Sequence, residues 1–258
     1  SCHRSKIQIC PIFEPMKVIV AILSNIYKLY FFLVVLLTLL VLYPAYFVLL
    51  NQEKHFLKGF HLLRFQSKLI LFLVGVRRDV IGSIPDDENT SYIICPNHSS
   101  YLDILLLYAI IPNYFVFLGK KELGSIPIFN IFFKRMNILV DRGNPKAAHN
   151  AILKACERME KGDNVVIFPE GTIPESAPEM KAFKNGAFRL ALDLNIPILP
   201  ITFTNHVNLL EDKFSFFAKC RPGKSTVYLH KPIYINKEEP QDLVALREEC
   251  KSLIASKL

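Results

Sequence analysis

One uncharged apolar segment constrains this chain of 258 residues more than any other feature. Residues 29–50 read LYFFLVVLLTLLVLYPAYFVLL and include no charged side chain. As an α-helix the segment extends about 33 Å, enough for the roughly 30 Å hydrocarbon core of a bilayer. It is too long for the apolar part of a signal peptide and lacks a small-residue cleavage site. We therefore expect a retained membrane-anchoring helix, as one crossing or as half of a shallow hairpin; the alternative is a buried helix of a soluble protein.

The positive charge of the chain flanks this segment. The formal net charge is +8, and residues 1–28 and 51–78 carry four and six Lys or Arg against one Glu each. Elsewhere 21 basic and 21 acidic side chains cancel. This distribution is typical of contact with an anionic membrane surface and not of the basic face of a nucleic-acid-binding protein. Residues 55–74 mix basic and apolar side chains, as a helix lying in the membrane interface does.

A change of composition after Arg77 and Arg78 predicts two domains: membrane-anchoring and interfacial helices over residues 1–78, and a second domain over residues 79–258. In the second domain, short apolar runs alternate with helical patterns. This alternation indicates an α/β fold, a mixed, largely parallel sheet flanked by helices. The expected strands are 92–95, 114–118, 138–140, 165–168, 197–203 and 226–230. The expected helices are 103–110, 146–161, 183–193 and 241–257.

The six cysteines are scattered without Cys-x-x-Cys spacing. This pattern predicts neither a zinc site nor a disulfide framework. Reduced thiols on a cytosolic domain are the plainer interpretation. We expect no bound metal and no cofactor.

The loop after the first expected strand holds a histidine and a carboxylate five residues apart, His98 and Asp103. Such a carboxylate can hold the imidazole in one tautomer, which leaves the other ring nitrogen to take a proton. The alternative is that His98 caps a helix while Asp103 faces solvent. The apolar strand before the pair and the small polar residues within it favour the first interpretation.

Two further loops follow apolar strands. Glu170, Gly171 and Thr172 come after residues 165–168, where the glycine lets backbone N–H groups approach an oxyanion or a phosphate. Arg142 follows the end of the expected strand 138–140 and is suited to bidentate phosphate contacts. The alternatives are an ordinary tight turn at Gly171 and a surface ion pair between Asp141 and Arg142.

Five blocks, in order, resemble the glycerolipid acyltransferases, and in particular the 1-acyl-glycerol-3-phosphate acyltransferases. They are NHSSYLD (97–103), KKEL with IPIF (120–123 and 126–129), VDR (140–142), FPEGT (168–172) and IPILPI (196–201). The resemblance covers about residues 55–235. One departure is that the family commonly continues EGT with Arg, whereas Ile173 and Pro174 follow here.

The resemblance implies transfer of a fatty acyl group from acyl-CoA or acyl carrier protein to the free hydroxyl of 1-acyl-glycerol 3-phosphate, giving phosphatidic acid. It implies that His98 is the general base and Asp103 its orienting partner, with backbone N–H groups near His98 as oxyanion donors. The implied substrate-binding residues are Lys121, Arg142, Glu170, Gly171, Thr172 and Lys184.

The same resemblance implies which partners and which location to expect. The partners are membrane lipids, the lysophospholipid acceptor and the acyl donor, and the active site lies on the cytosolic face of a membrane. Two alternatives remain open. The acceptor can be another lysophospholipid or glycerol 3-phosphate, or the chain is a non-catalytic lipid-binding protein of the membrane.

Overall fold

The computed structural model describes residues 13–258 apart from residues 86, 88–89, 142, 214 and 237–240. A long helix, α1 (Phe13–Leu49), is followed by the 3-10 turn η1 (Glu53–His55) and by α2 (Phe56–Leu73). The uncharged segment therefore lies in the second half of α1. The interfacial pattern of residues 55–74 corresponds to α2, which contacts both α1 and α3 (Leu102–Ile110).

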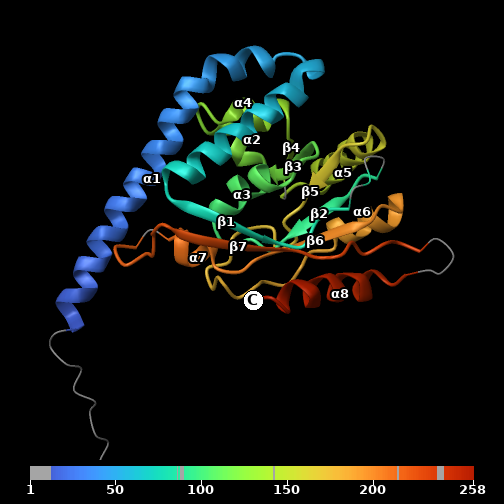
Figure 1. Cartoon of the computed structure of the whole chain (residues 1–258). Coiled ribbons are helices and arrows are strands. Elements are labelled where there is room, and N and C mark those ends of the chain that lie inside the picture. The colour runs from blue at the N-terminus through green and yellow to red at the C-terminus, as the bar shows by residue number, and fades with distance from the viewer. Residues whose placement is uncertain (1–12, 86, 88–89, 142, 214, 237–240) are drawn as a thin grey trace, which may run out of the picture.

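The helix α1 runs along one side of the molecule, and its N-terminal end projects beyond the other helices and the sheet in Figure 1. It is the one helix in the described residues with the length and apolarity to cross a membrane, over Pro15–Leu49. Most of its large apolar side chains are exposed, Val41 by 77 %. Because exposed apolar surface of this extent is unfavourable in water, α1 fits association with a membrane and not the core of a soluble protein. Leu39 and Tyr46, on its buried side, join the core.

The other elements alternate along the chain. The strands are β1 (Val76–Ile81), β2 (Ile93–Pro96), β3 (Phe115–Lys120), β4 (Ile138–Val140), β5 (Asn164–Val166), β6 (Ile198–Phe203) and β7 (Gly223–Leu229). The remaining helices are η2 (Lys121–Ser125), α4 (Asn130–Arg135), α5 (Pro145–Glu160), α6 (Gly186–Leu194), α7 (His206–Leu209) and α8 (Leu243–Ala255).

The strands form one sheet in the order β1-β7-β6-β2-β5-β3-β4. Neighbouring strands are parallel except β6 and β7, which are antiparallel. The expected mixed, largely parallel sheet flanked by helices is thus confirmed, and each expected strand and helix has a counterpart. The strand β1 was not expected, because Arg77, Arg78 and Asp79 hide an edge strand whose side chains are mostly solvent-facing. The boundary expected at residue 78 falls inside β1.

Side-chain alternation along the central strand β2 places a hydrophobic core on each face of the sheet. Ile94 belongs to the core shared with α1, α2, α3 and α4, whereas Ile93 and Cys95 belong to the core shared with α5, α6 and α8. The helices cover the sheet from both sides in Figure 1. Since β2 lies between β6 and β5, the loop at its carboxyl end starts from the middle of the sheet.

Candidate active site

The turn that carries His98 runs from the end of β2 to the start of α3. Asn97 attaches it to β6, because its side chain accepts a hydrogen bond from the Phe203 N–H (2.7 Å) and donates one to the Phe203 carbonyl (3.0 Å). Both bonds are buried, so they are protected from competition with water. His98 therefore leaves the sheet in a fixed direction.

Asp103, in the first turn of α3, organises this turn. Its Oδ2 lies 2.9 Å from His98 Nδ1 and accepts the N–H groups of Ser99 (2.7 Å) and Ser100 (3.0 Å). The side chain of Asp103 is 0 % exposed and that of His98 is 12 % exposed. The structure thus brings this predicted pair together, and the alternative in which Asp103 faces solvent is wrong. Because Nδ1 contacts Asp103, Nε2 is the ring nitrogen left for a substrate proton.

A second histidine, His206 at the start of α7, binds the other oxygen of Asp103. Its Nδ1 lies 2.5 Å from Asp103 Oδ1 and its Nε2 lies 2.6 Å from Ser225 Oγ on β7. His206 and Ser225 are fully buried, and the His206 ring stacks on Phe203. Sequence reasoning missed His206, because 103 residues separate it from Asp103 and no recognised motif contains it. The available signal was a lone histidine shortly after an apolar strand.

The two histidines determine the charge of Asp103. Burial raises the pKa of this carboxyl, but the hydrogen bonds from His206 and His98, and the attraction of these rings, outweigh burial and bring the pKa to about 2. Asp103 is therefore ionised at any physiological pH. A buried carboxylate beside an imidazole stabilises the imidazolium, so His98 is supported when it takes a proton.

Glu170 joins the His98 turn to the segment that follows β5. Its Oε1 accepts the N–H of His98 and its Oε2 accepts the N–H of Lys181, both at 2.8 Å. Burial raises the pKa of Glu170, and the two backbone hydrogen bonds oppose that rise. Since both oxygens bind backbone, Glu170 positions the turn. The N–H groups of His98, Ser99 and Ser100 all donate to carboxylates, so these three are not free to bind an oxyanion.

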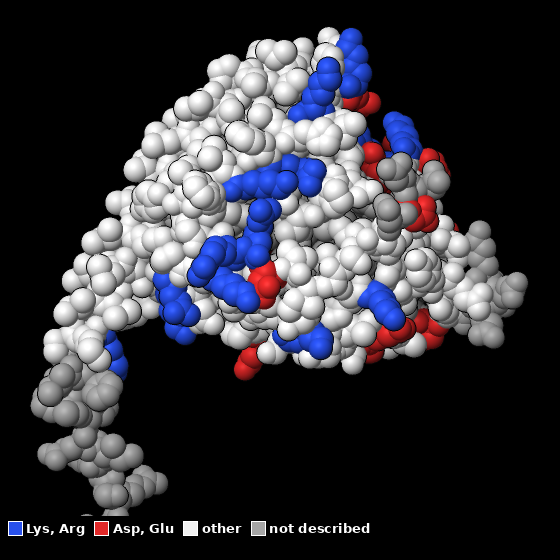
Figure 2. Space-filling view, in the orientation of Figure 1, with Lys and Arg blue, Asp and Glu red and all other residues white. Residues whose placement is uncertain are grey.

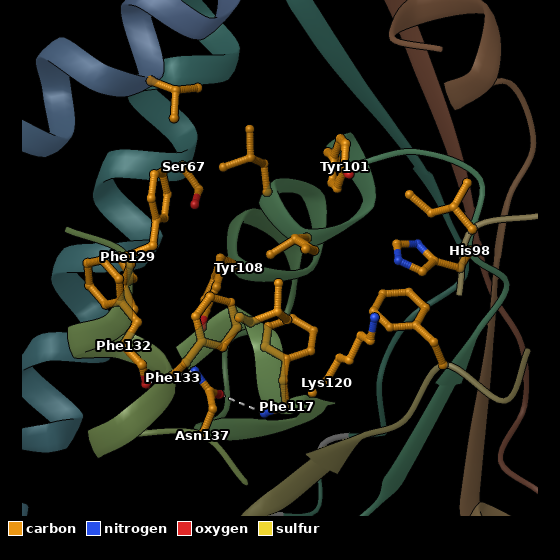
Figure 3. A pocket seen from close by; sticks show the side chains of 18 of the residues that line it. Ser67, His98, Tyr101, Tyr108, Phe117, Lys120, Phe129, Phe132, Phe133 and Asn137 are labelled. Carbon is orange, nitrogen blue, oxygen red and sulfur yellow. Dashed lines mark hydrogen bonds between the residues drawn. The ribbon is translucent and has the colours of Figure 1, made fainter. Parts of the chain in front are cut away.

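A cavity of about 330 Å³ opens beside His98. Its lining is mostly apolar and includes Leu39, Leu63, Ile70, Leu105, Phe117 and Leu123. Figure 3 shows His98 at one end and Phe129 and Phe132 at the other. The ring of Phe168 stacks on His98, with the ring centroids 3.9 Å apart. An apolar chamber that ends at a histidine suits a hydrocarbon chain whose reactive group lies at the histidine.

Two of the three cations predicted to bind phosphate do not line this cavity. Lys121 and Lys184 are exposed and are not among the described residues that line it. Lys121 instead forms an ion pair with Asp141 at 3.2 Å, and Arg142 lies outside the described residues. Lys120, which the sequence did not single out, lines the cavity, and Figure 3 shows its side chain extending toward His98.

Gly171 and Thr172, the other predicted substrate-binding residues, line the cavity beside His98. Gly171 has a φ of +80°, a backbone conformation that is strained for other residues. Ile173 also lines the cavity, so the departure from the family pattern places an apolar side chain there.

In the parts of the chain that the structure describes, no group of three or more His, Cys, Asp or Glu side chains is placed to hold a metal ion. Both oxygens of Asp103 are occupied by two imidazole rings and two backbone N–H groups. The cysteines in those same parts of the chain are free thiols.

Comparison with known proteins adds independent information. The model of the acyltransferase family matches residues 77–204. A 1-acyl-sn-glycerol-3-phosphate acyltransferase of Helicobacter pylori is 34 % identical over 143 residues, which are 55 % of this chain and 59 % of that protein. An enzyme of the same name from Borreliella burgdorferi is 31 % identical over 173 residues, 67 % of each chain. The matches thus span about six tenths to two thirds of these relatives.

The fold is also found among solved structures. The crystal structure of a 1-acyl-sn-glycerophosphate acyltransferase from Thermotoga maritima superposes with a TM-score of 0.73 at 22 % sequence identity. The superposition covers 91 % of this chain and 94 % of that one.

Proposed function

Since this chain belongs to the acyltransferase family, we propose that it transfers a fatty acyl group from a thioester donor to the free hydroxyl of 1-acyl-glycerol 3-phosphate, giving phosphatidic acid. The observation that carries this proposal is the His98–Asp103 pair at the end of an apolar cavity. The acceptor in this proposal is taken from the names of the relatives, and the His98–Asp103 pair provides the general base that acyl transfer requires.

His98 is the general base in this proposal. The acceptor hydroxyl is a poor nucleophile at neutral pH, so its proton passes to His98 Nε2 as its oxygen attacks the thioester carbonyl. The ionised Asp103 stabilises the imidazolium that forms. When the tetrahedral intermediate collapses, the carbon–sulfur bond breaks and the imidazolium returns the proton to the departing thiolate. The acyl group passes directly to the acceptor, and no covalent acyl-enzyme forms.

The cavity holds the fatty acyl chain. Each methylene that moves from water into an apolar site gains about 0.8 kcal/mol, so the walls contributed by α1, α2, α3 and β3 favour a long chain. Because His98 lies at one end, a chain that fills the cavity places its carbonyl carbon beside the hydroxyl that His98 deprotonates.

Lys120 is the cation best placed for the acceptor phosphate, because it lines the cavity and extends toward His98. Its ammonium also lies 3.4 Å from Glu122 Oε1 in an exposed ion pair, which a phosphate can replace. Lys121, Arg142 and Lys184 remain candidates from the family resemblance for binding the phosphate as it enters. The donor in this proposal is acyl-CoA or acyl carrier protein. Both are cytosolic thioesters, so the active site faces the cytosol while α1 contacts the membrane.

An acceptor panel tests the proposed reaction. The purified full chain in mixed micelles is given a labelled acyl thioester with 1-acyl-glycerol 3-phosphate, a zwitterionic lysophospholipid or glycerol 3-phosphate. We expect phosphatidic acid to form at least ten times faster than the other products. Transfer to none of the three acceptors, from either donor, contradicts the proposed enzyme activity and favours a lipid-binding protein.

A second candidate acceptor, a zwitterionic lysophospholipid, is favoured by one observation. Ile173 places an apolar side chain in the cavity where the family commonly has Arg. The variant Ile173→Arg separates the two candidates. If the acceptor is a phosphate monoester, the added cation leaves kcat/KM equal or raises it by a factor of about two to three; if the acceptor is zwitterionic, the same variant lowers kcat/KM.

A further inference from the structure

Three cations gather on the surface where α2 meets β1. Arg64 and Lys68 are one helical turn apart on α2, and Arg78 lies on β1. We call these residues the α2–β1 cation cluster. Figure 2 shows Lys and Arg in a band across this part of the molecule, beside the uncharged surface of α1. Arg78 donates a hydrogen bond to the Ala109 carbonyl at the end of α3, which fixes its direction.

No acidic side chain among the described residues forms an ion pair with the cluster. The acid nearest in sequence, Asp79, pairs with Lys224 at 2.8 Å. The Nε of Arg64 is buried and has no hydrogen-bond partner. Burial lowers the pKa of Lys68, and the charges of Arg64 and Arg78 lower it further. Three cations that repel one another, one with an unsatisfied buried N–H, are an arrangement that an anion stabilises.

The surroundings of the cluster indicate where that anion comes from. Phe65 and Phe72 lie on the same side of α2 as Lys68, three residues before it and four residues after it, and they are 57 % and 79 % exposed. Exposed rings on a helix that also carries cations are typical of a helix in the lipid interface, with the rings among acyl chains and the cations at the phosphates. A soluble phosphate has no apolar part to contact these rings, whereas a phospholipid has acyl chains.

We propose that the α2–β1 cation cluster is a binding site for the phosphate of an anionic phospholipid, separate from the cavity at His98. The Arg64 guanidinium and the Lys68 ammonium donate to the phosphate oxygens, Arg78 adds charge from the adjoining strand, and Phe65 and Phe72 contact the lipid chains. The inner face of α2 contributes Leu63, Gln66, Ser67 and Ile70 to the cavity. A lipid held on the outer face therefore fixes the helix that forms one cavity wall.

Binding of phosphatidylglycerol to the full chain in non-ionic detergent tests this site, because this lipid carries one phosphodiester and is not the proposed acceptor. The test variant is Arg64→Gln with Lys68→Gln. The matched control is Lys54→Gln with Lys58→Gln, which removes the same charge from η1 and the first turn of α2. We expect the test variant to bind phosphatidylglycerol at least tenfold more weakly than the wild type and the control to lose less than twofold. Phosphatidylcholine should bind weakly to all three.

Each other outcome overturns the proposal. Equal losses in the two double variants indicate diffuse attraction to charge, and no loss in either indicates that the cluster binds no phosphate. Displacement of the lipid by millimolar inorganic phosphate identifies a soluble anion as the ligand. The thermal unfolding midpoint of each variant confirms that the proteins are folded. None of these readouts involves acyl transfer, so the result stands apart from the proposed function.

Discussion

His98 lies in a turn whose polar groups are buried and bonded to one another, whereas the lysines near the cavity lie at the surface. Asp103 and His206 are fully buried and have defined partners. The side chain of Lys121 is 67 % exposed, and that of Lys120 is 58 % exposed. Surface ion pairs contribute little to stability and allow side chains to move. We infer that the structure fixes the proton-transfer geometry tightly and leaves the phosphate contacts adjustable, so changes in the two regions should have effects of different size.

The largest effect is expected at His98. Replacing it by Ala (His98→Ala) removes the general base, and such a base contributes about 10²–10⁴-fold in rate. Because His98 is partly exposed and lies in a turn, no core cavity opens. The measurement is turnover with saturating donor and acceptor, with circular dichroism as the control for folding. A folded variant that keeps more than a tenth of the wild-type rate shows that another group is the base.

Asp103→Asn should be nearly as severe, with a loss of about 10² or more. The amide has no charge to stabilise the imidazolium, and its NH₂ group meets N–H donors that the carboxylate accepted. Turnover compared with that of His98→Ala is the measurement. An unchanged rate means that Asp103 has no part in orienting His98.

The same variant has a pH signature in stability. The folded-state pKa of Asp103 lies below its ordinary value of 3.8, so its contribution to stability is present above that value and is lost as the pH falls toward about 2. The difference in the free energy of unfolding between wild type and Asp103→Asn should therefore shrink as the pH falls through this range. Chemical unfolding at several pH values measures it.

A smaller effect is expected at His206, which acts through Asp103. His206→Leu removes a charge-assisted hydrogen bond, a contribution of about 1.5–3 kcal/mol, and we expect kcat to fall about tenfold with little change in the KM of the acceptor. His206→Asn keeps a donor toward Asp103 and should recover much of the loss. If both variants lower the unfolding midpoint while kcat stays unchanged, His206 only fills the core.

The smallest effects are expected at the surface cations, where the structure and the family resemblance differ. Lys120→Ala should raise the KM for 1-acyl-glycerol 3-phosphate about tenfold, since one charged contact is lost. Lys121→Ala, the matched control one residue further on, should change that KM less than about threefold, because Lys121 is not among the described residues that line the cavity. The reverse order of effects supports the family resemblance over the placement of Lys120 at the cavity.

Most of the sheet and part of the site could be predicted from the sequence alone. Apolar runs predicted six strands of the sheet, since buried strands are distinctive, but β1 was hidden by the charges that an edge strand tolerates. The His98–Asp103 pair was predictable because a strand end and a helix start hold it within one local turn. His206 was not, because its contact with Asp103 exists only after β6, β7 and α3 have come together.

The sequence could not distinguish the roles of the adjacent residues Lys120 and Lys121. A motif with two adjacent lysines cannot tell which one turns toward the cavity, because that depends on where β3 ends and η2 begins. The structure places Lys120 at the last position of β3 and Lys121 at the first of η2. Glu170 was predicted from the family resemblance to bind substrate. That both of its oxygens accept backbone N–H groups could be known only from the structure.

We infer that the His98 turn works as one catalytic unit, and a double-mutant cycle can test this. The rates of wild type, His98→Ala, Asp103→Asn and the double variant are compared under identical saturating conditions. If Asp103 acts through His98, the double variant is no more than about threefold slower than His98→Ala, because the carboxylate has no base left to orient. Losses that multiply instead, so that the double variant is about 10² slower than His98→Ala, contradict the claim and assign Asp103 a separate role.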